Sequence, residues 1–241
     1  NWNSMGSETA LYGASNDNFS WGISLSANGN IMAVGAHEND TPKNNSGEVK
    51  IYEYNSGSSV WDVKATLNGV ETFDKFGSAV DLSSDGLTVA VGAPYHRVGG
   101  SGDFVGKVSV FKWDGSNYVT GSDLIGSDKY DFFGAHLSLD NEGNTLAVMG
   151  PGRDATSGST YLNKGRVRVY NYDGSNWVQS PSSYDFDGEA DGDQSAGSLN
   201  ESKGQRVFLS GDGSVLAIGA DLNDGSATDS GHVRVYKLFE P

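Results

Sequence analysis

The stretch from Phe76 to Gly86 reads Phe-Gly-Ser-Ala-Val-Asp-Leu-Ser-Ser-Asp-Gly, and it decides the fold of this chain. Apolar and polar residues alternate after the Phe-Gly pair, which indicates a short β-strand. Asp85 and Gly86 then place a glycine where a tight hairpin needs a positive φ. An apolar run from Leu87 to Gly92 follows, and we expect it to be a strand buried on both faces. The stretch therefore predicts the first two strands of an antiparallel sheet.

The same stretch recurs through the chain at a fixed spacing. Its opening position and its turn glycine return after 57, 57 and 70 residues, and the longer last step contains an acidic insertion. The opening positions are Phe19, Phe76, Phe133 and Lys203, and the turn glycines are Gly29, Gly86, Gly143 and Gly213. A third strand of the form Gly-x-Val-x-Val/Ile-Tyr/Phe opens at Gly47, Gly106, Gly165 and Gly231, and a fourth begins at Trp61, Tyr118 or Trp177. A period above 50 residues with β-type alternation is typical of a propeller.

The repeats predict an all-β fold, a β-propeller with four blades of four antiparallel strands. We expect one domain over residues 1–241, with repeats at about 19–75, 76–132, 133–202 and 203–241 plus 1–18. Asn1 and Trp2 match the start of a fourth strand, whereas the run from Val233 to Phe239 is a third strand with no fourth after it. Pairing the N-terminal strand with the C-terminal blade would close the ring and hide two sheet edges.

The Phe-Gly pair and the later Gly-Ala-Pro together resemble the FG-GAP repeat. The residues that carry the resemblance are Phe76-Gly77 with Gly92-Ala93-Pro94, Phe133-Gly134 with Gly150-Pro151, and the pairs Gly35-Ala36 and Gly219-Ala220. The FG-GAP repeat is known from the propeller heads of integrin α chains and from secreted proteins of marine microbes and algae. The resemblance implies a propeller and an extracellular or cell-surface location. The calcium loops of integrins are not expected here, because the turn from Ser83 to Gly86 is too short to wrap six to eight oxygen ligands.

Charge and composition exclude several classes of function. The net charge of −15 argues against nucleic acid as a partner, because phosphate binding needs clustered Lys and Arg. No run of 18 apolar residues occurs, so membrane insertion is not predicted. Cysteine is absent, which excludes disulfides, thiol catalysis and cysteine-bound metals.

The long connections are expected to emerge on one face, which we call the long-loop face. They are 37–46, 94–105, 151–164 and 221–230 between second and third strands, and 3–18, 64–75, 121–132 and 180–202 between blades. Variable loops on a rigid scaffold commonly carry binding sites. The candidate ligand-binding residues are Tyr95, His96, Arg97, Phe104, Tyr130 and Tyr161. Aromatic side chains and arginine are frequent anchors of binding patches, but such rings can instead fold inward over the blades. Trp2, Trp61, Tyr118 and Trp177 are expected to serve inter-blade packing.

An acidic loop from Tyr184 to Asp193 is the strongest candidate cation site. Its candidate ligands are Asp187, Glu189, Asp191 and Asp193. Alternating acidic residues can converge on a calcium ion, although a solvated acidic loop is the alternative. A weaker candidate consists of Asp221, Asp224 and Asp229. No cofactor is predicted to be required. Asn-x-Ser sequons at Asn18, Asn44 and Asn200 are acceptor sites for glycans in a secreted chain.

Catalytic patterns are missing from the sequence. The four histidines stand at different places in the repeat, without the His-x-x-x-His or Gly-x-Ser-x-Gly spacing of known sites. His136 is expected on an innermost strand in a hydrogen-bonded structural role. The sequence therefore predicts no enzyme but a non-catalytic extracellular interaction module for adhesion or surface assembly, with a protein or glycan partner at the cell surface or in the extracellular matrix. The alternatives are a lectin-like, carbohydrate-binding propeller and a structural subunit that self-assembles into a filament or coat through its terminal strands.

Overall fold

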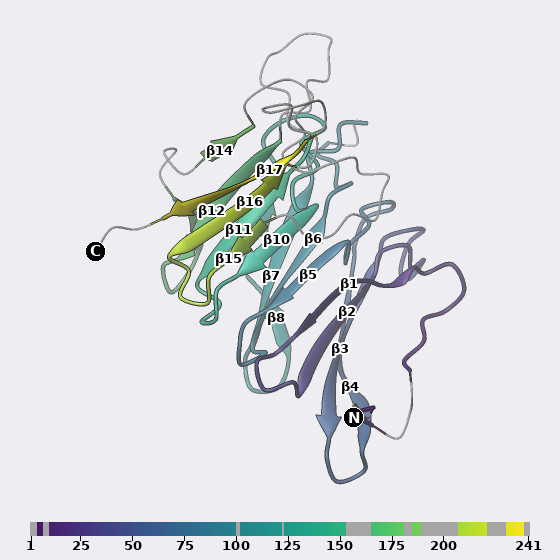
Figure 1. The fold of residues 1–241 in the computed structure, drawn as a ribbon. Helices are drawn as coiled ribbons and strands as arrows, with labels where there is room; N and C mark the ends of the chain where they lie inside the picture. Colours follow the sequence, from purple (N-terminus) through teal and green to yellow (C-terminus); the bar gives the residue numbers. More distant parts are fainter. Residues whose placement is uncertain are drawn as a thin grey trace.

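The computed structural model describes residues 4–6, 10–99, 102–121, 123–152, 165–180, 185–188, 207–220 and 230–238. These residues form an all-β structure of four antiparallel sheets, shown in Figure 1. We number the sheets 1 to 4 in chain order. The all-β prediction is therefore confirmed.

Each sheet is a meander whose strands follow one another in the chain. Sheet 1 contains β1 (Phe19–Leu25), β2 (Ile31–Ala36), β3 (Glu48–Asn55) and β4 (Val60–Asn68). Sheet 2 contains β5 (Ala79–Leu82), β6 (Thr88–Ala93), β7 (Lys107–Trp113), β8 (Tyr118–Thr120) and β9 (Leu124–Ile125). Sheet 3 contains β10 (His136–Leu139), β11 (Thr145–Gly150), β12 (Arg166–Tyr172), β13 (Trp177–Gln179) and β14 (Asp185–Asp187). Sheet 4 contains β15 (Val207–Leu209), β16 (Val215–Ala220) and β17 (His232–Lys237).

The predicted hairpins between first and second strands are present in all four sheets. The turn glycines have left-handed φ values of 71° at Gly29, 73° at Gly86, 66° at Gly143 and 69° at Gly213. Each of these N–H groups donates to the carbonyl three residues earlier, at 2.8 to 3.1 Å. Glycine recurs at this place because other residues lose about 1 to 2 kcal/mol in that conformation.

The outer strands extend further along the chain than the sequence predicted. Residues 64–68 continue β4, although they were expected to start a long loop. In sheets 2 and 3 the outer strand is interrupted: β8 and β9 both pair with β7, and β13 and β14 both pair with β12. The strands β9 and β14 were not predicted because strands of two and three residues are too short to show an alternating pattern.

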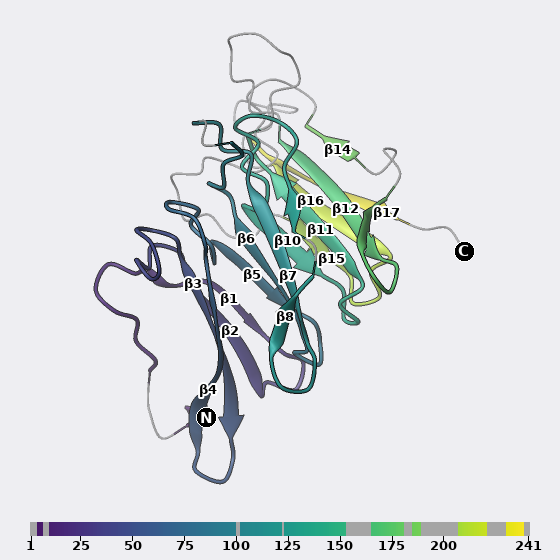
Figure 2. The same ribbon diagram turned by 180° about the vertical axis from the view of Figure 1, so that it is seen from behind.

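The sheets are stacked in a row through their first strands. β5 packs against β1 and β2, β10 packs against β5 and β6, and β15 packs against β10 and β11. Figures 1 and 2 show the row running from the purple and blue sheet 1 to the green and yellow sheet 4, with these two sheets at opposite ends. Each sheet therefore has a front face toward the preceding sheet and a back face toward the following one.

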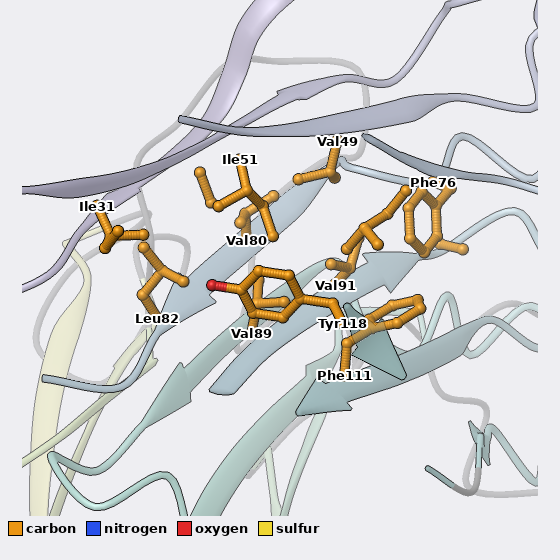
Figure 3. Packing of buried hydrophobic residues seen from close by; sticks show 13 residues of the cluster. Ile31, Val49, Ile51, Phe76, Val80, Leu82, Val89, Val91, Phe111 and Tyr118 are labelled. Carbon is orange, nitrogen blue, oxygen red and sulfur yellow. The ribbon is translucent and has the colours of Figure 1, made fainter. Parts of the chain in front are cut away.

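Three separate apolar cores fill the spaces between neighbouring sheets. Between sheets 1 and 2, Val49 and Ile51 on the back of β3 meet Val80 and Leu82 on the front of β5, as Figure 3 shows. The second core joins Ala90, Val108 and Val110 of sheet 2 to Phe133, Leu137 and Leu139 of sheet 3, and the third joins Met149, Val167 and Val169 of sheet 3 to Val207, Leu216 and Ile218 of sheet 4. Tyr118 and Trp177 belong to the first two cores, so their predicted packing role is confirmed.

The recurring glycines also explain how closely the sheets approach. A Cβ on Gly35 would lie 2.1 Å from the carbonyl oxygen of Gly77, and a Cβ on Gly92 would lie 2.0 Å from that of Gly134. The glycine after the phenylalanine in one sheet therefore packs directly on the glycine at the end of the second strand in the preceding sheet. Any side chain there would push the two sheets apart.

The predicted closed ring is not seen among the described residues. Sheet 4 has three strands, and β17 is paired there with β16 alone. Met5 instead lies beside β4 in sheet 1, where its carbonyl accepts a hydrogen bond of 3.1 Å from the indole of Trp61. Residues 1–3, which carry the predicted closing strand, lie outside the described residues. Within the described part of the chain, no helix has the length and hydropathy of a membrane span.

Candidate binding surface

A turn with the same backbone geometry precedes the first strand in sheets 1, 2 and 3. An aspartate stands at its centre, and both flanking residues have left-handed φ values. The three turns are Asn16-Asp17-Asn18 (φ 67° and 50° at the flanks), Phe73-Asp74-Lys75 (66° and 55°) and Tyr130-Asp131-Phe132 (57° and 52°). We call these the Asp turns. Bulky residues are strained in this conformation by roughly 1 kcal/mol or more each, so the surrounding contacts must hold them there.

Backbone and side-chain contacts of the central aspartate hold each Asp turn. The aspartate carbonyl accepts an N–H from the loop after the second strand: Glu38 to Asp17 at 3.3 Å, Tyr95 to Asp74 at 3.3 Å and Gly152 to Asp131 at 3.2 Å. The carboxylates lie 2.9 Å from the Asn39 amide for Asp17, 3.0 Å from Nδ1 of His96 for Asp74 and 3.6 Å from the Arg168 guanidinium for Asp131. Asp74 and Asp131 are almost fully buried. Both of these buried carboxylates therefore have a polar or cationic partner, which is the condition under which buried carboxylates are retained.

Four aromatic side chains gather where two Asp turns meet the connection between β6 and β7. We call Tyr95, Phe104, Tyr130 and Phe132 the aromatic cluster. The centroid of the Phe104 ring lies 5.2 Å from Tyr95, 6.0 Å from Tyr130 and 5.6 Å from Phe132, with which it is stacked. All four side chains are half-buried, so each ring is packed on its neighbours and still open to solvent. Such rings offer a large, stiff contact area.

Two cations lie over the aromatic cluster. The guanidinium of Arg97 is 4.7 Å from the Phe104 centroid, and Nζ of Lys75 is 5.0 Å from the Tyr95 centroid. Lys75 also pairs with Glu38 at 3.1 Å. Cation–π contacts of this length are favourable by about 0.5 to 1 kcal/mol at exposed sites. The surface therefore combines apolar rings with positive charge on a chain whose net charge is −15.

The structure brings five of the six candidate ligand-binding residues together. Tyr95, His96, Arg97, Phe104 and Tyr130 all belong to this surface, whereas Tyr161 lies outside the described residues. Asp74, Lys75 and Phe132 also belong to this surface, and they were not among the predicted residues. The signal for Asp74 was present, because the aspartate recurs at positions 17, 74 and 131 with the same spacing of 57 as the phenylalanines.

The candidate cation sites are only partly described. Asp185 to Asp187 form β14, so the start of the predicted acidic loop is a strand. The Asp187 carboxylate accepts two hydrogen bonds from the guanidinium of Arg166. Glu189, Asp191, Asp193, Asp221, Asp224 and Asp229 lie outside the described residues. In the described ranges, no three acidic or histidine side chains are grouped as metal ligands.

Two of the three sequons can be located. Asn18 and Asn44 are exposed near the long-loop face, and Asn200 lies outside the described residues. The Asn18 amide donates to Glu38 at 2.7 Å, so a glycan attached there would replace this hydrogen bond.

The histidines occupy different environments. His37 is 4% exposed, and its ring centroid lies 4.5 Å from that of Trp21. Burial, assisted by the nearby charge of Lys75, lowers the pKa of His37 to about 4, so it is neutral at physiological pH. His136 begins β10, the first strand of sheet 3, and is half-buried. His232 begins β17.

Comparison with known proteins finds a similarity for the N-terminal part of the chain. No curated protein matches this chain. The family model described as the FG-GAP repeat matches residues 2–52, a range that ends within β3 of sheet 1. The close contacts between Gly35 and Gly77 and between Gly92 and Gly134 give the physical reason for the two glycine motifs in the later sheets. Over residues 2–52, this chain is therefore similar to the FG-GAP repeat.

Proposed function

We propose that this protein is a non-catalytic interaction module of the propeller type, which acts at the cell surface or outside the cell. Its partner, a protein or a glycan, contacts the aromatic cluster and the flanking cations Lys75 and Arg97. The four sheets serve as consecutive blades that hold the loops in place. No metal ion is required for this contact, since side-chain rings and cations provide it.

The observation that supports the proposal is the convergence of residues from two connections on one half-buried cluster. Tyr95 and Phe104 come from the connection between β6 and β7, and Tyr130 and Phe132 come from the Asp turn before β10. Strained turns held by buried aspartates are typical of functional loops. Rigid aromatic side chains lose little conformational freedom on binding, which favours affinity.

Carbohydrate binding is the second candidate. The stacked pair of Phe104 and Phe132, with 5.6 Å between centroids and 23° between ring planes, provides a flat apolar area of the kind that a sugar ring can cover. The neighbouring polar groups of His96 and Arg97 would then reach hydroxyl groups at its edge.

A triple variant tests both candidates. Tyr95→Ser, Phe104→Ser and Tyr130→Ser together remove the outer rings and keep small polar side chains. Wild-type protein and variant are applied to a glycan array and to an array of purified extracellular-matrix proteins, each with calcium and with chelator. Wild type is expected to bind on one array in both conditions, and the variant is expected to bind at least tenfold more weakly.

The matched control is Leu87→Ser. Leu87 is 43% exposed in the β5–β6 hairpin, at the end of the sheet opposite to the long loops. The control should bind as wild type does, and thermal unfolding should show that both proteins are folded. Wild-type binding by the folded triple variant contradicts the proposed surface, and loss of binding in chelator contradicts metal independence. Binding on the glycan array alone favours the carbohydrate candidate.

A further inference from the structure

The back face of sheet 4 exposes residues that are buried in every other sheet. Val233 and Val235 of β17 are 70% and 67% exposed. By the repeat spacing, the counterparts of Val233 are Val49, Val108 and Val167, all 0% exposed. The counterparts of Val235 are Ile51, Val110 and Val169, which are 0% to 1% exposed. The back face of sheet 4 therefore carries the same apolar residues as the covered back faces of the other three sheets.

The front face of sheet 1 shows the same feature at the other end of the row. Ile23 and Leu25 of β1 are 59% and 54% exposed. The counterparts of Ile23 are Val80, Leu137 and Val207, at 7% or less, and two counterparts of Leu25 are Leu82 and Leu139, both 7% exposed. Exposed contiguous apolar residues of this kind mark interaction surfaces.

The two exposed faces correspond to the two sides of each internal core. Inside the chain, a back face with the pattern of Val49 and Ile51 always covers a front face with the pattern of Val80 and Leu82, as in Figure 3. We propose that two copies of this chain associate head to tail, with the back face of sheet 4 in one copy packed on the front face of sheet 1 in the other. This contact would have the same arrangement of apolar residues as the internal cores. It does not involve the long-loop face.

Backbone hydrogen bonds between the hairpins also join each sheet to the following one. The hairpin tips are joined by backbone hydrogen bonds from Ala27 N–H to Ser84 carbonyl at 2.9 Å, from Ser84 to Asn141 at 2.9 Å, and from Asn141 to Gly211 at 2.8 Å. Gly211 and Ala27 are exposed at the two ends of this series. In the head-to-tail pair, Gly211 of one copy would donate to the carbonyl of Ala27 in the other.

Two positions make this contact weaker than an internal one. Ser20 occupies the repeat position of Gly77 and Gly134, which pack on the preceding sheet. A Cβ at Gly77 would lie 2.8 Å from the Glu48 carbonyl oxygen, so the Cβ of Ser20 would make a similarly close contact with the other copy. Phe208 occupies the repeat position of Ser138, whose hydroxyl accepts the Leu209 N–H at 3.1 Å. Because phenylalanine has no hydroxyl, sheet 4 cannot make the equivalent hydrogen bond to a sheet packed behind it. The association is therefore reversible and depends on concentration.

The geometry of the pair is heterologous, because different faces meet. Such contacts either close a ring or continue as an open chain. Two copies carry eight sheets, and propellers typically have 4 to 8 blades. A closed dimer would cover the front face of sheet 1 and the back face of sheet 4 in both copies.

Sedimentation velocity and light scattering on the full chain test the proposal. The wild-type mass is expected to rise from 25.4 kDa toward twice that value or beyond as concentration increases. A tail variant, Val233→Asp with Val235→Asp, and a head variant, Ile23→Asp with Leu25→Asp, should each associate roughly a hundredfold more weakly, since each loses the burial of two apolar side chains. The head variant keeps an intact back face of sheet 4, and the tail variant keeps an intact front face of sheet 1. An equimolar mixture of the two variants should therefore form a 1:1 pair through these two faces. Ser20→Gly should strengthen wild-type association.

The control is Val178→Asp in β13, where Val178 is 50% exposed on an outer strand. This variant should associate as wild type does. Circular dichroism must show that all variants are folded, which is expected since every changed residue is exposed. A wild type that stays monomeric at high concentration overturns the proposal. Dimers of the head variant alone would overturn it too, because they would require tail-to-tail packing.

Discussion

Gly92 shows how a single residue sets the distance between two sheets. It lies at the end of β6, and its hydrogen atoms face the carbonyl oxygen of Gly134 across the gap between sheets 2 and 3. The contact is backbone against backbone, so no flexible side chain can move aside. The glycine motif of this chain is therefore a packing requirement, repeated between Gly35 and Gly77.

Replacing Gly92 with Ala should lower the free energy of unfolding by about 2 to 3 kcal/mol, because the added methyl group would overlap the Gly134 carbonyl. Urea denaturation followed by tryptophan fluorescence measures the change. The control is Gly102→Ala, where nothing lies within 4 Å of the added Cβ, and the change should stay within about 0.5 kcal/mol. Equal stability of the two variants would contradict the close contact.

His37 makes the stability depend on pH. Its pKa of about 4 in the folded protein lies below the ordinary value of 6.5, so the unfolded chain binds a proton at a pH where the folded chain does not. Stability should therefore fall as the pH is lowered from about 6.5 to 4, and it is unaffected by this group above that window. The shift corresponds to a loss of about 3 kcal/mol at the acidic end.

The variant His37→Gln should remove this part of the acid sensitivity. The difference between the unfolding free energies at pH 7 and pH 4 should shrink by about 2 to 3 kcal/mol relative to wild type. Chemical denaturation at both pH values measures it. An unchanged difference would show that His37 is not the group that titrates.

At the scale of the elements, side-chain links join the inner strands of neighbouring sheets. The Ser24 hydroxyl donates to Asp81 at 2.8 Å, and the other oxygen of Asp81 accepts the Leu139 N–H at 2.8 Å. Asp81 of β5 therefore joins β1 to β10. Burial raises the pKa of Asp81, more than its hydrogen bonds lower it. At the same position of the next repeat, Ser138 makes the same kind of link to Leu209 with a hydroxyl group.

Asp81→Ala should reduce the free energy of unfolding by about 2 to 3 kcal/mol, since it leaves the Leu139 N–H without its acceptor between the sheets. Asp81→Ser should lose about 1 kcal/mol less, because a hydroxyl can accept this N–H as Ser138 does for Leu209. Thermal unfolding of the two variants measures the difference. If Ser is no better than Ala, the link between β5 and β10 does not stabilise the stack.

At the scale of the whole molecule, the described residues leave the front face of sheet 1 and the back face of sheet 4 without cover. Internal sheets bury both faces and are stabilised from both sides. Sheets 1 and 4 are each supported by one neighbour among the described residues. The ends of the row are therefore the places where association with another sheet gains the most free energy.

Head-to-tail association should strengthen with ionic strength. Each copy carries a net charge of −15, so two copies repel one another at low salt. The screening length falls from about 30 Å at 0.01 M to about 10 Å at 0.1 M, which weakens the repulsion while the apolar contact remains. Sedimentation velocity at these two concentrations of NaCl should show a higher average mass at 0.1 M. A lower mass at 0.1 M would indicate that ion pairs hold the copies together.

Much of the candidate binding surface could be located from the sequence, but not all of its residues. Tyr95, Arg97 and Phe104 were identified because they are aromatic or cationic residues in a long connection. Phe132 could not be predicted, because the repeated phenylalanine position is that of its neighbour Phe133. The Asp187 candidate could not be judged from the sequence, because its pairing with Arg166 depends on the register between β12 and β14.

The sequence by itself determined the four repeats, the hairpin turns and the order of the strands within each sheet. These features follow from local alternation and from glycines with positive φ, which act over a few residues. The tertiary structure alone decided which loop side chains meet, where Asp187 finds its partner and which apolar faces remain uncovered. Those outcomes depend on how the sheets stack and on the register between strands, and contacts between residues far apart in the chain leave no local pattern in the sequence.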